Sequence, residues 1–130
     1  MTEERSCKGS VSDTELEVLK VLWEVREATV RDLLERLKVL GRDWAYTTVQ
    51  TLVVRLCRKG YVETRRQGKA HVFTPCVDQE ELLRFELDGL ADRVCGGRAT
   101  PLMMTLVRDN AFSPEELAEL RRLLDKLDQD

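Results

Sequence analysis

Residues 45–62 read AYTTVQTLVVRLCRKGYV, and this stretch presents two different faces at helical spacing. Four aliphatic residues recur at i, i+3, i+4 and i+7, which predicts a helix with one side packed on a core. They are Val49, Leu52, Val53 and Leu56. The other side holds only Thr, Gln and Arg, although the chain as a whole is acidic, with a net charge of −3. The stretch therefore predicts a helix with one buried face and one bare, positive, hydrogen-bonding face.

Two further helices are expected before this one. SDTE at 12–15 and TVRD at 29–32 have the spacing of a capping box, and apolar residues follow each at helical intervals. The first of these helices is expected to end near Val25. The helix within 45–62 is expected to begin with Thr47 as its N-cap and Gln50 closing the box, and to stop before Gly60.

The periodicity changes to two after Gly60. YVETRR at 61–66 and AHVFTP at 70–75 are strand-like, and QGK at 67–69 places a glycine in the turn between them. Three helices followed by a β-hairpin, with short connections, predict a winged helix-turn-helix domain over residues 12–77. Residues 1–11 are polar and are expected to form a flexible N-terminal segment.

Residues 78–130 predict a second, helical region, so that the fold class is mostly α with a small β-hairpin. Asp78, Pro101 and the run SPEE at 113–116 are each suited to the first turn of a helix. Leucines line these helices at spacings of three and four: Leu83, Leu87, Leu90, Leu102, Leu106, Leu117, Leu120, Leu124 and Leu127. About fifty residues cannot easily bury that surface alone, so we expect a homodimer held by this region. Packing of the leucines back on their own domain is the alternative.

The net charge is divided unevenly along the chain. Residues 1–77 carry +3 and residues 78–130 carry −6, while residues 55–71 alone carry +5. A basic stripe on an otherwise acidic protein indicates a polyanionic partner.

The bare face of the helix has the side chains that read double-stranded DNA. Glutamine can hydrogen-bond adenine edges, threonine can contact a base or a phosphate, and arginines further along a recognition helix meet phosphates. The expected DNA-contacting residues are Tyr46, Thr47, Thr48, Gln50, Thr51, Arg55 and Arg58 on the helix, with Arg65, Arg66, Lys69 and His71 on the hairpin. Trp44 and Tyr46 are expected to cover the core, with the Tyr46 hydroxyl able to reach a phosphate.

The chain resembles the penicillinase repressor family of bacterial winged-helix regulators (BlaI/MecI type) from about residue 11 to residue 127. The resemblance lies in LEVLKVLWE, ATVRDLLERL, YTTVQTLVVRLCRKGYV, GKAHVFTP and SPEELAELRRLLD. It implies a homodimer, held by its C-terminal helices, that binds an inverted-repeat operator and represses genes such as those for β-lactam resistance.

Two features of that family are missing from this sequence. A membrane sensor protease cuts some members at an Asn–Phe bond, whose position falls near Thr105 and Leu106 here. The nearest asparagine, Asn110, is separated from Phe112 by Ala111, so a sensor protease as partner is in doubt. The paired CxC motifs of the copper-responsive members are also missing.

Other classes of protein fit less well. His71 is the single histidine and has no nucleophile or metal-ligand partner at useful spacing, so neither an enzyme, a metal site nor a cofactor is expected. The sequence has no apolar run long enough to span a membrane, and its N-terminus lacks the apolar core of a signal peptide, so we expect a cytoplasmic protein. Cys7, Cys57, Cys76 and Cys95 are scattered, and we expect free thiols. The main alternative function is a dimeric winged-helix protein-interaction module without sequence-specific DNA binding.

Overall fold

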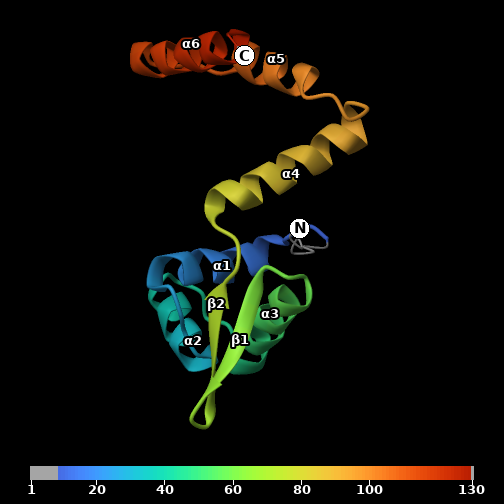
Figure 1. Ribbon diagram of the computed structural model, residues 1–130. Coiled ribbons are helices and arrows are strands. Elements are labelled where there is room, and N and C mark those ends of the chain that lie inside the picture. The colour runs from blue at the N-terminus through green and yellow to red at the C-terminus, as the bar shows by residue number, and fades with distance from the viewer. Residues whose placement is uncertain (1–8, 130) are drawn as a thin grey trace. The chain divides into compact units, whose positions relative to one another are not determined.

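The computed structural model describes residues 9–129 and confirms a winged-helix fold. The chain divides into two compact units, one ending at Glu86 and the other beginning at Leu87. In chain order the elements are α1 (Asp13–Val25), α2 (Val30–Val39), α3 (Tyr46–Arg58), β1 (Val62–Gln67), β2 (Ala70–Pro75), α4 (Gln79–Val94), α5 (Thr100–Asp109) and α6 (Pro114–Asp128) (Figure 1). The unit boundary lies within α4. Residues 1–8 of the expected flexible segment lie outside the described residues.

Capping boxes begin α1 and α2 as predicted. Ser12 Oγ accepts a hydrogen bond from Glu15 N at 3.2 Å, and Thr29 Oγ1 accepts one from Asp32 N at 3.1 Å. In each box the acid at the third helical position also accepts from the backbone N–H of the N-cap residue. These local bonds satisfy donors that the first turn of a helix leaves without a partner, which is why the two starts are readable from sequence.

The predicted start of α3 is wrong by two residues. Ala45, not Thr47, is the N-cap, and Thr47 and Gln50 do not form a capping box. Val49 N donates to Ala45 O at 3.1 Å, and Trp44 and Val49, which flank the first turn, both pack in the core cluster. Trp44 and Val49 occupy the two positions of a hydrophobic staple. The helix therefore begins between two residues that pack in the core, and no threonine side chain caps it.

The wing is a two-stranded antiparallel hairpin closed by Gly68 and Lys69. Gln67 pairs with Ala70, and Gly68 has φ +66°, as the first loop residue of a type II′ turn requires. Gly60 has φ +88° just after the last turn of α3, which confirms its predicted helix-stopping role. The hairpin tip extends beyond the three helices of its unit (Figure 1).

A single β-bridge outside the hairpin supports the wing and was not predicted. Ala28, between α1 and α2, bridges to Phe73 of β2 through two backbone hydrogen bonds of 3.1 and 2.8 Å. Both residues are buried. The bridge fixes the wing to the helix-turn-helix core at the base of the hairpin.

A buried carboxylate joins the ends of α1 and α3. Glu15 is 2% exposed, and its Oε1 accepts from Lys59 Nζ at 2.7 Å and from Ser12 N at 3.0 Å. Desolvation raises the pKa of Glu15, but Lys59 and Ser12 together outweigh it, and the pKa lies below its ordinary value of 4.5. Lys59 also donates to Ser10 O, and Tyr61 Oη donates to Gly9 O, so residues 9 and 10 are tied to this corner.

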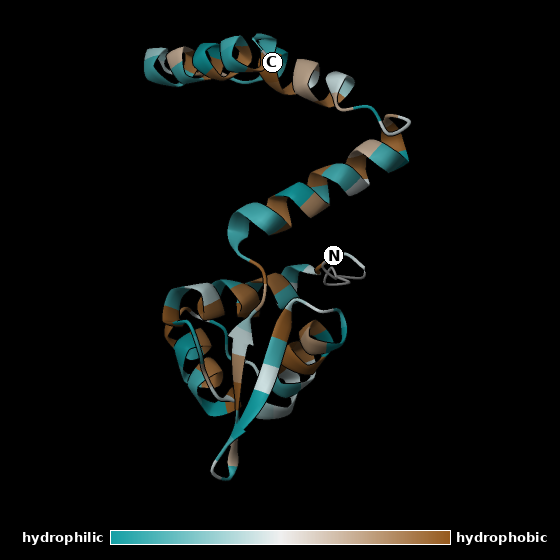
Figure 2. Ribbon diagram, viewed as in Figure 1, coloured by the Kyte–Doolittle hydropathy of each residue, from teal (hydrophilic) through white to brown (hydrophobic). Residues whose placement is uncertain are grey.

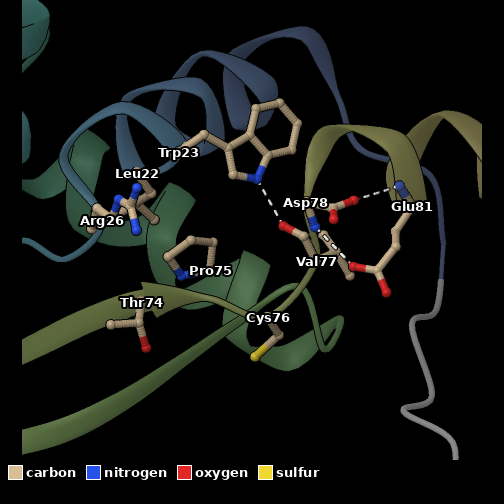
Figure 3. A pocket seen from close by; sticks show the side chains of 9 residues that line it. All are labelled: Leu22, Trp23, Arg26, Thr74, Pro75, Cys76, Val77, Asp78 and Glu81. Carbon is tan, nitrogen blue, oxygen red and sulfur yellow. Dashed lines mark hydrogen bonds between the residues drawn. The ribbon is translucent and has the colours of Figure 1, made fainter.

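Trp23 holds the segment that leads into α4. Its Nε1 donates to Val77 O at 2.7 Å (Figure 3). Asp78 then caps α4 as predicted, because its Oδ1 accepts from Glu81 N at 2.8 Å and its own N–H donates to Glu81 Oε1 at 2.9 Å. The chain therefore leaves the winged helix at a fixed place.

The helices of the second unit leave most of their large apolar residues exposed. Hydrophobic and hydrophilic residues alternate along α5 and α6 (Figure 2), yet neither helix buries a residue. Val94 of α4 is 70% exposed, and Leu124 and Leu127 of α6 are 60% and 62% exposed. Clustered exposure of large apolar side chains is typical of an interaction surface.

Candidate nucleic-acid interface

The residues expected to contact DNA from α3 are all exposed or half-buried, and most lie on the face that a helical wheel predicts. At 100° per residue, Thr47, Thr51 and Arg58 lie directly opposite the buried face. Thr48 and Arg55 form one flank of that exposed face, and Tyr46 and Gln50 form the flank next to the wing. The positions on α3 therefore serve two different surfaces, an outer face and a flank that faces the hairpin.

The first turn of α3 differs from the first turns of α1, α2 and α6. Those three helices have capping boxes with an acid, whereas within the described residues α3 has neither an acid in its first turn nor a side chain bonded to its end. Its first N–H groups thus remain available, and the helix dipole makes this end positive. Such an end can accept an anion such as a phosphate.

The arginines of α3 and those of the wing differ in whether their side chains already have hydrogen-bond or ion-pair partners. Within residues 9–129, the side chains of Arg55 and Arg58 have no hydrogen bond or ion pair. Arg65, in contrast, donates to Glu27 at 2.9 Å and to Gln67 at 3.1 Å. Arg66 donates to the Gly68 carbonyl at 3.3 Å, its single side-chain hydrogen bond among residues 9–129. Arg65 must therefore share or exchange its bond to Glu27 in order to bind a phosphate.

Four of the predicted residues line a cleft between α3 and the wing. Tyr46, Gln50, Lys69 and His71 border a space of about 660 Å³. Tyr46 is 44% exposed and is not part of the core cluster, so the prediction that it covers the core is wrong, while Trp44 does pack there. The reason is the earlier start of α3, which turns Tyr46 toward the wing.

The cleft also contains residues that the sequence did not single out as DNA-contacting. Thr29 and Arg31, at the start of α2, line it beside the hairpin residues. Arg31 is a cation in the first turn of a helix, where the helix dipole disfavours positive charge. This unfavourable position of a positive charge is visible in the sequence and could have identified Arg31 as a candidate site residue.

The cysteines and the acids give no sign of a catalytic or metal centre in the part of the chain that the structure describes. Cys57, Cys76 and Cys95 are free thiols, and Cys7 lies outside the described residues. Burial, with a smaller contribution from Cys76, raises the pKa of the Cys57 thiol to about 11. Across residues 9–129, no three side chains of the metal-binding types come together to hold an ion. No helix in this range combines the length and apolar composition needed to cross a bilayer.

The leucines expected at a dimer interface are distributed over all three C-terminal helices. Leu83, Leu87, Leu90, Leu106, Leu124 and Leu127 are exposed, and Leu102, Leu117 and Leu120 are half-buried. Leu120 and Leu123 line an open groove of about 430 Å³ with Phe112. None of these side chains is buried within the described part of the chain.

Comparison with known proteins shows that the sequence and fold of this chain are similar to those of bacterial repressors. The model of the penicillinase repressor family matches residues 11–126. The transcriptional regulator BlaI of Mycobacterium tuberculosis is 36% identical over 121 residues, covering 91% of this chain and 85% of that protein. The penicillinase repressor of Bacillus licheniformis is 27% identical over 116 residues, covering 89% and 90%. The solution structure of the DNA-binding domain of the repressor BlaI superposes with a TM-score of 0.51 at 29% identity, covering 62% of this chain and 93% of that domain.

Proposed function

The chain belongs to the penicillinase repressor family, and we propose that it is a cytoplasmic transcriptional repressor that binds an inverted-repeat DNA operator as a homodimer. The outer face of α3 carries this proposal. It presents threonines and unpaired arginines beside a helix start that has no acid in its first turn. A DNA strand offers the phosphates and base edges that these groups bind.

The two ends of α3 have different tasks in this proposal. The N-terminal turn enters the major groove, where Thr47, Gln50 and Thr51 meet base edges. Arg55 and Arg58 lie one turn or more later and meet phosphates, and Arg65 and Arg66 extend those contacts along the wing. No chemical step is needed, because the bound protein blocks RNA polymerase by occupying the promoter.

Base-reading and phosphate-binding residues predict different mutant behaviour. Thr51→Ala should weaken binding to the preferred sequence by about 1–3 kcal/mol and leave unrelated sequences unchanged. Arg66→Gln should weaken all sequences alike and flatten the dependence of log affinity on log salt by about 0.9 for each phosphate that the protein no longer neutralises. Titrations of labelled duplexes at several salt concentrations measure both effects. Identical behaviour of the two variants would contradict the division into base readers and phosphate-binding residues.

A second copy of the chain accounts for the uncovered apolar side chains of α4, α5 and α6. The two-fold axis of a dimer would present two copies of α3 to two half-sites, about one DNA turn (~34 Å) or a multiple apart. An inverted-repeat operator is the DNA counterpart of this symmetry.

Selection of binding sites from a randomised duplex pool tests the proposed function. Recovery of an inverted repeat with half-sites one helical turn or a multiple apart would support it. Recovery of no sequence, with weak binding that salt abolishes, would overturn it in favour of a winged-helix protein-interaction module. Purified full-length protein is sufficient for this experiment.

A further inference from the structure

The cleft between α2, α3 and the wing has an uneven distribution of charge. Arg31 enters it from the start of α2, and Lys69 and His71 enter it from the hairpin. Within the described residues, none of the twelve that line it is Asp or Glu. The cleft beside Trp23 contains Asp78 and Glu81 (Figure 3), and the groove on α6 contains Glu116 and Glu119. The cleft at Arg31 is thus suited to an anion in a way that these two are not.

The three basic side chains in this cleft are not engaged elsewhere. Between residues 9 and 129, no hydrogen bond or ion pair involves the side chain of Arg31, Lys69 or His71. The neighbouring acid, Asp32, is turned back to the N–H of Thr29 at 3.1 Å. A negative ligand in the cleft would therefore meet these side chains without first breaking an ion pair.

Arg31 is also placed against the local preference of its helix. Positive charge at a helix start opposes the helix dipole, and the first turns of α1 and α6 carry acids instead. A residue that breaks a local rule is expected where function compensates for it. For Arg31, the function that its position in the cleft allows is binding an anion.

The shape and chemistry of the cleft match one stretch of DNA backbone. Its lining includes the apolar residues Val54 and Phe73, which suit the apolar face of a deoxyribose, together with Arg31, Lys69 and His71. Gln50, which lies on the flank of α3 next to the wing and is proposed to meet a base edge, borders the same cleft. We infer that this cleft binds a sugar–phosphate segment of the operator and that Arg31, from α2, binds one of its phosphates. This inference rests on the proposed function.

Phosphate binding in this cleft gives α2 a role in positioning α3 on the DNA. A phosphate held between Arg31 and Lys69 fixes the wing-side flank of α3 against the strand, and so sets the depth at which Gln50 and Thr51 meet the base edges. The contact carries no sequence information of its own.

Arg31→Gln tests the inference against Lys38→Gln, which removes one positive charge from the same helix outside the cleft. Affinity for the selected operator is measured from about 50 to 200 mM salt. Arg31→Gln should bind about fourfold to tenfold more weakly and flatten the salt slope by about 0.9 per protomer, while Lys38→Gln keeps the slope of the unmodified protein. Arg31→Lys should restore the slope, because it retains the charge.

Duplexes with single uncharged methylphosphonate linkages locate the contact. The unmodified protein should lose affinity when one particular phosphate of each half-site is neutralised, and Arg31→Gln should be insensitive to that change. Lys69→Gln should lose sensitivity at the same or the adjacent phosphate, whereas Lys38→Gln keeps full sensitivity. An Arg31→Gln protein that retains the salt slope and every phosphate sensitivity overturns the inference, while an unmodified protein that selects no operator overturns the proposed function itself.

Discussion

Leu120→Asp and Leu124→Asp should each convert the protein to a monomer that binds its operator about 10²–10⁴-fold more weakly. Within the described chain Leu120 is only half-buried and Leu124 is 60% exposed, and a carboxylate placed at either position in a proposed two-fold interface would have to be buried. Loss of the dimer removes binding at the second half-site, which in a linked pair contributes an advantage of about this size. Sedimentation gives the mass, and operator titration gives the affinity.

The control for this prediction places the same acid on the opposite face of α6. Arg122 lies about half a turn away from the leucine seam, and Arg122→Asp changes the charge by more than the leucine variants do. It should remain dimeric. Unfolding of the winged helix should be unchanged in all three variants. Leucine variants that sediment as dimers would show that the interface lies elsewhere.

Lys59→Met should lower the free energy of unfolding by about 3 kcal/mol at neutral pH. The substitution keeps the apolar stem but leaves the Glu15 carboxylate, 2% exposed, without its ion-pair partner at 2.7 Å. Removing one member of a buried pair costs about 3–5 kcal/mol, and the partial exposure of Lys59 places this case at the lower end. Urea denaturation measures the change.

The pH dependence identifies Glu15 as the cause. Its pKa is lowered from 4.5 in the folded protein, so the pair contributes stability above pH 4.5, and this contribution is lost as the pH falls through the folded-state value. The difference between the unmodified protein and Lys59→Met should therefore shrink as the pH falls, and should be lost below the folded-state pKa of the unmodified protein, where Glu15 is protonated in both. A difference that stays constant from neutral pH down to well below the folded-state pKa would contradict this origin.

Two further variants separate the buried charge from other effects. Adding Glu15→Gln to Lys59→Met removes the unpaired charge and should recover part of the stability, since glutamine can still accept from Ser12 N. Arg36→Met breaks the exposed Arg36–Glu24 pair, whose side chains are 42% and 54% exposed, and should cost less than about 1 kcal/mol.

The helices, the hairpin and the exposed face of α3 could be predicted from the sequence because they depend on local periodicity. Ser12 with Glu15 and Thr29 with Asp32 cap their helices across three residues, and Gly60 ends α3 one residue past its C-cap. Each of these features is decided by neighbours in the chain, so the pattern of residue types is sufficient.

Tertiary packing decided what the local pattern could not. α3 begins ahead of the predicted threonine cap, between Trp44 and Val49, which both pack in the core, and Tyr46 lines the cleft beside the wing. Ala28 bridges to Phe73, and Glu15 pairs with Lys59 across 44 positions of sequence.

The candidate site also has some features that the sequence determines and others that depend on tertiary packing. The sequence by itself determined that α3 has a bare, positive face and that the hairpin carries cations, because periodicity and charge are written in the order of residues. Only the tertiary structure placed Arg31 beside Lys69 and His71 and paired Arg65 with Glu27. These neighbours come from different elements, and their meeting depends on how the helices pack around the shared core rather than on any spacing along the chain.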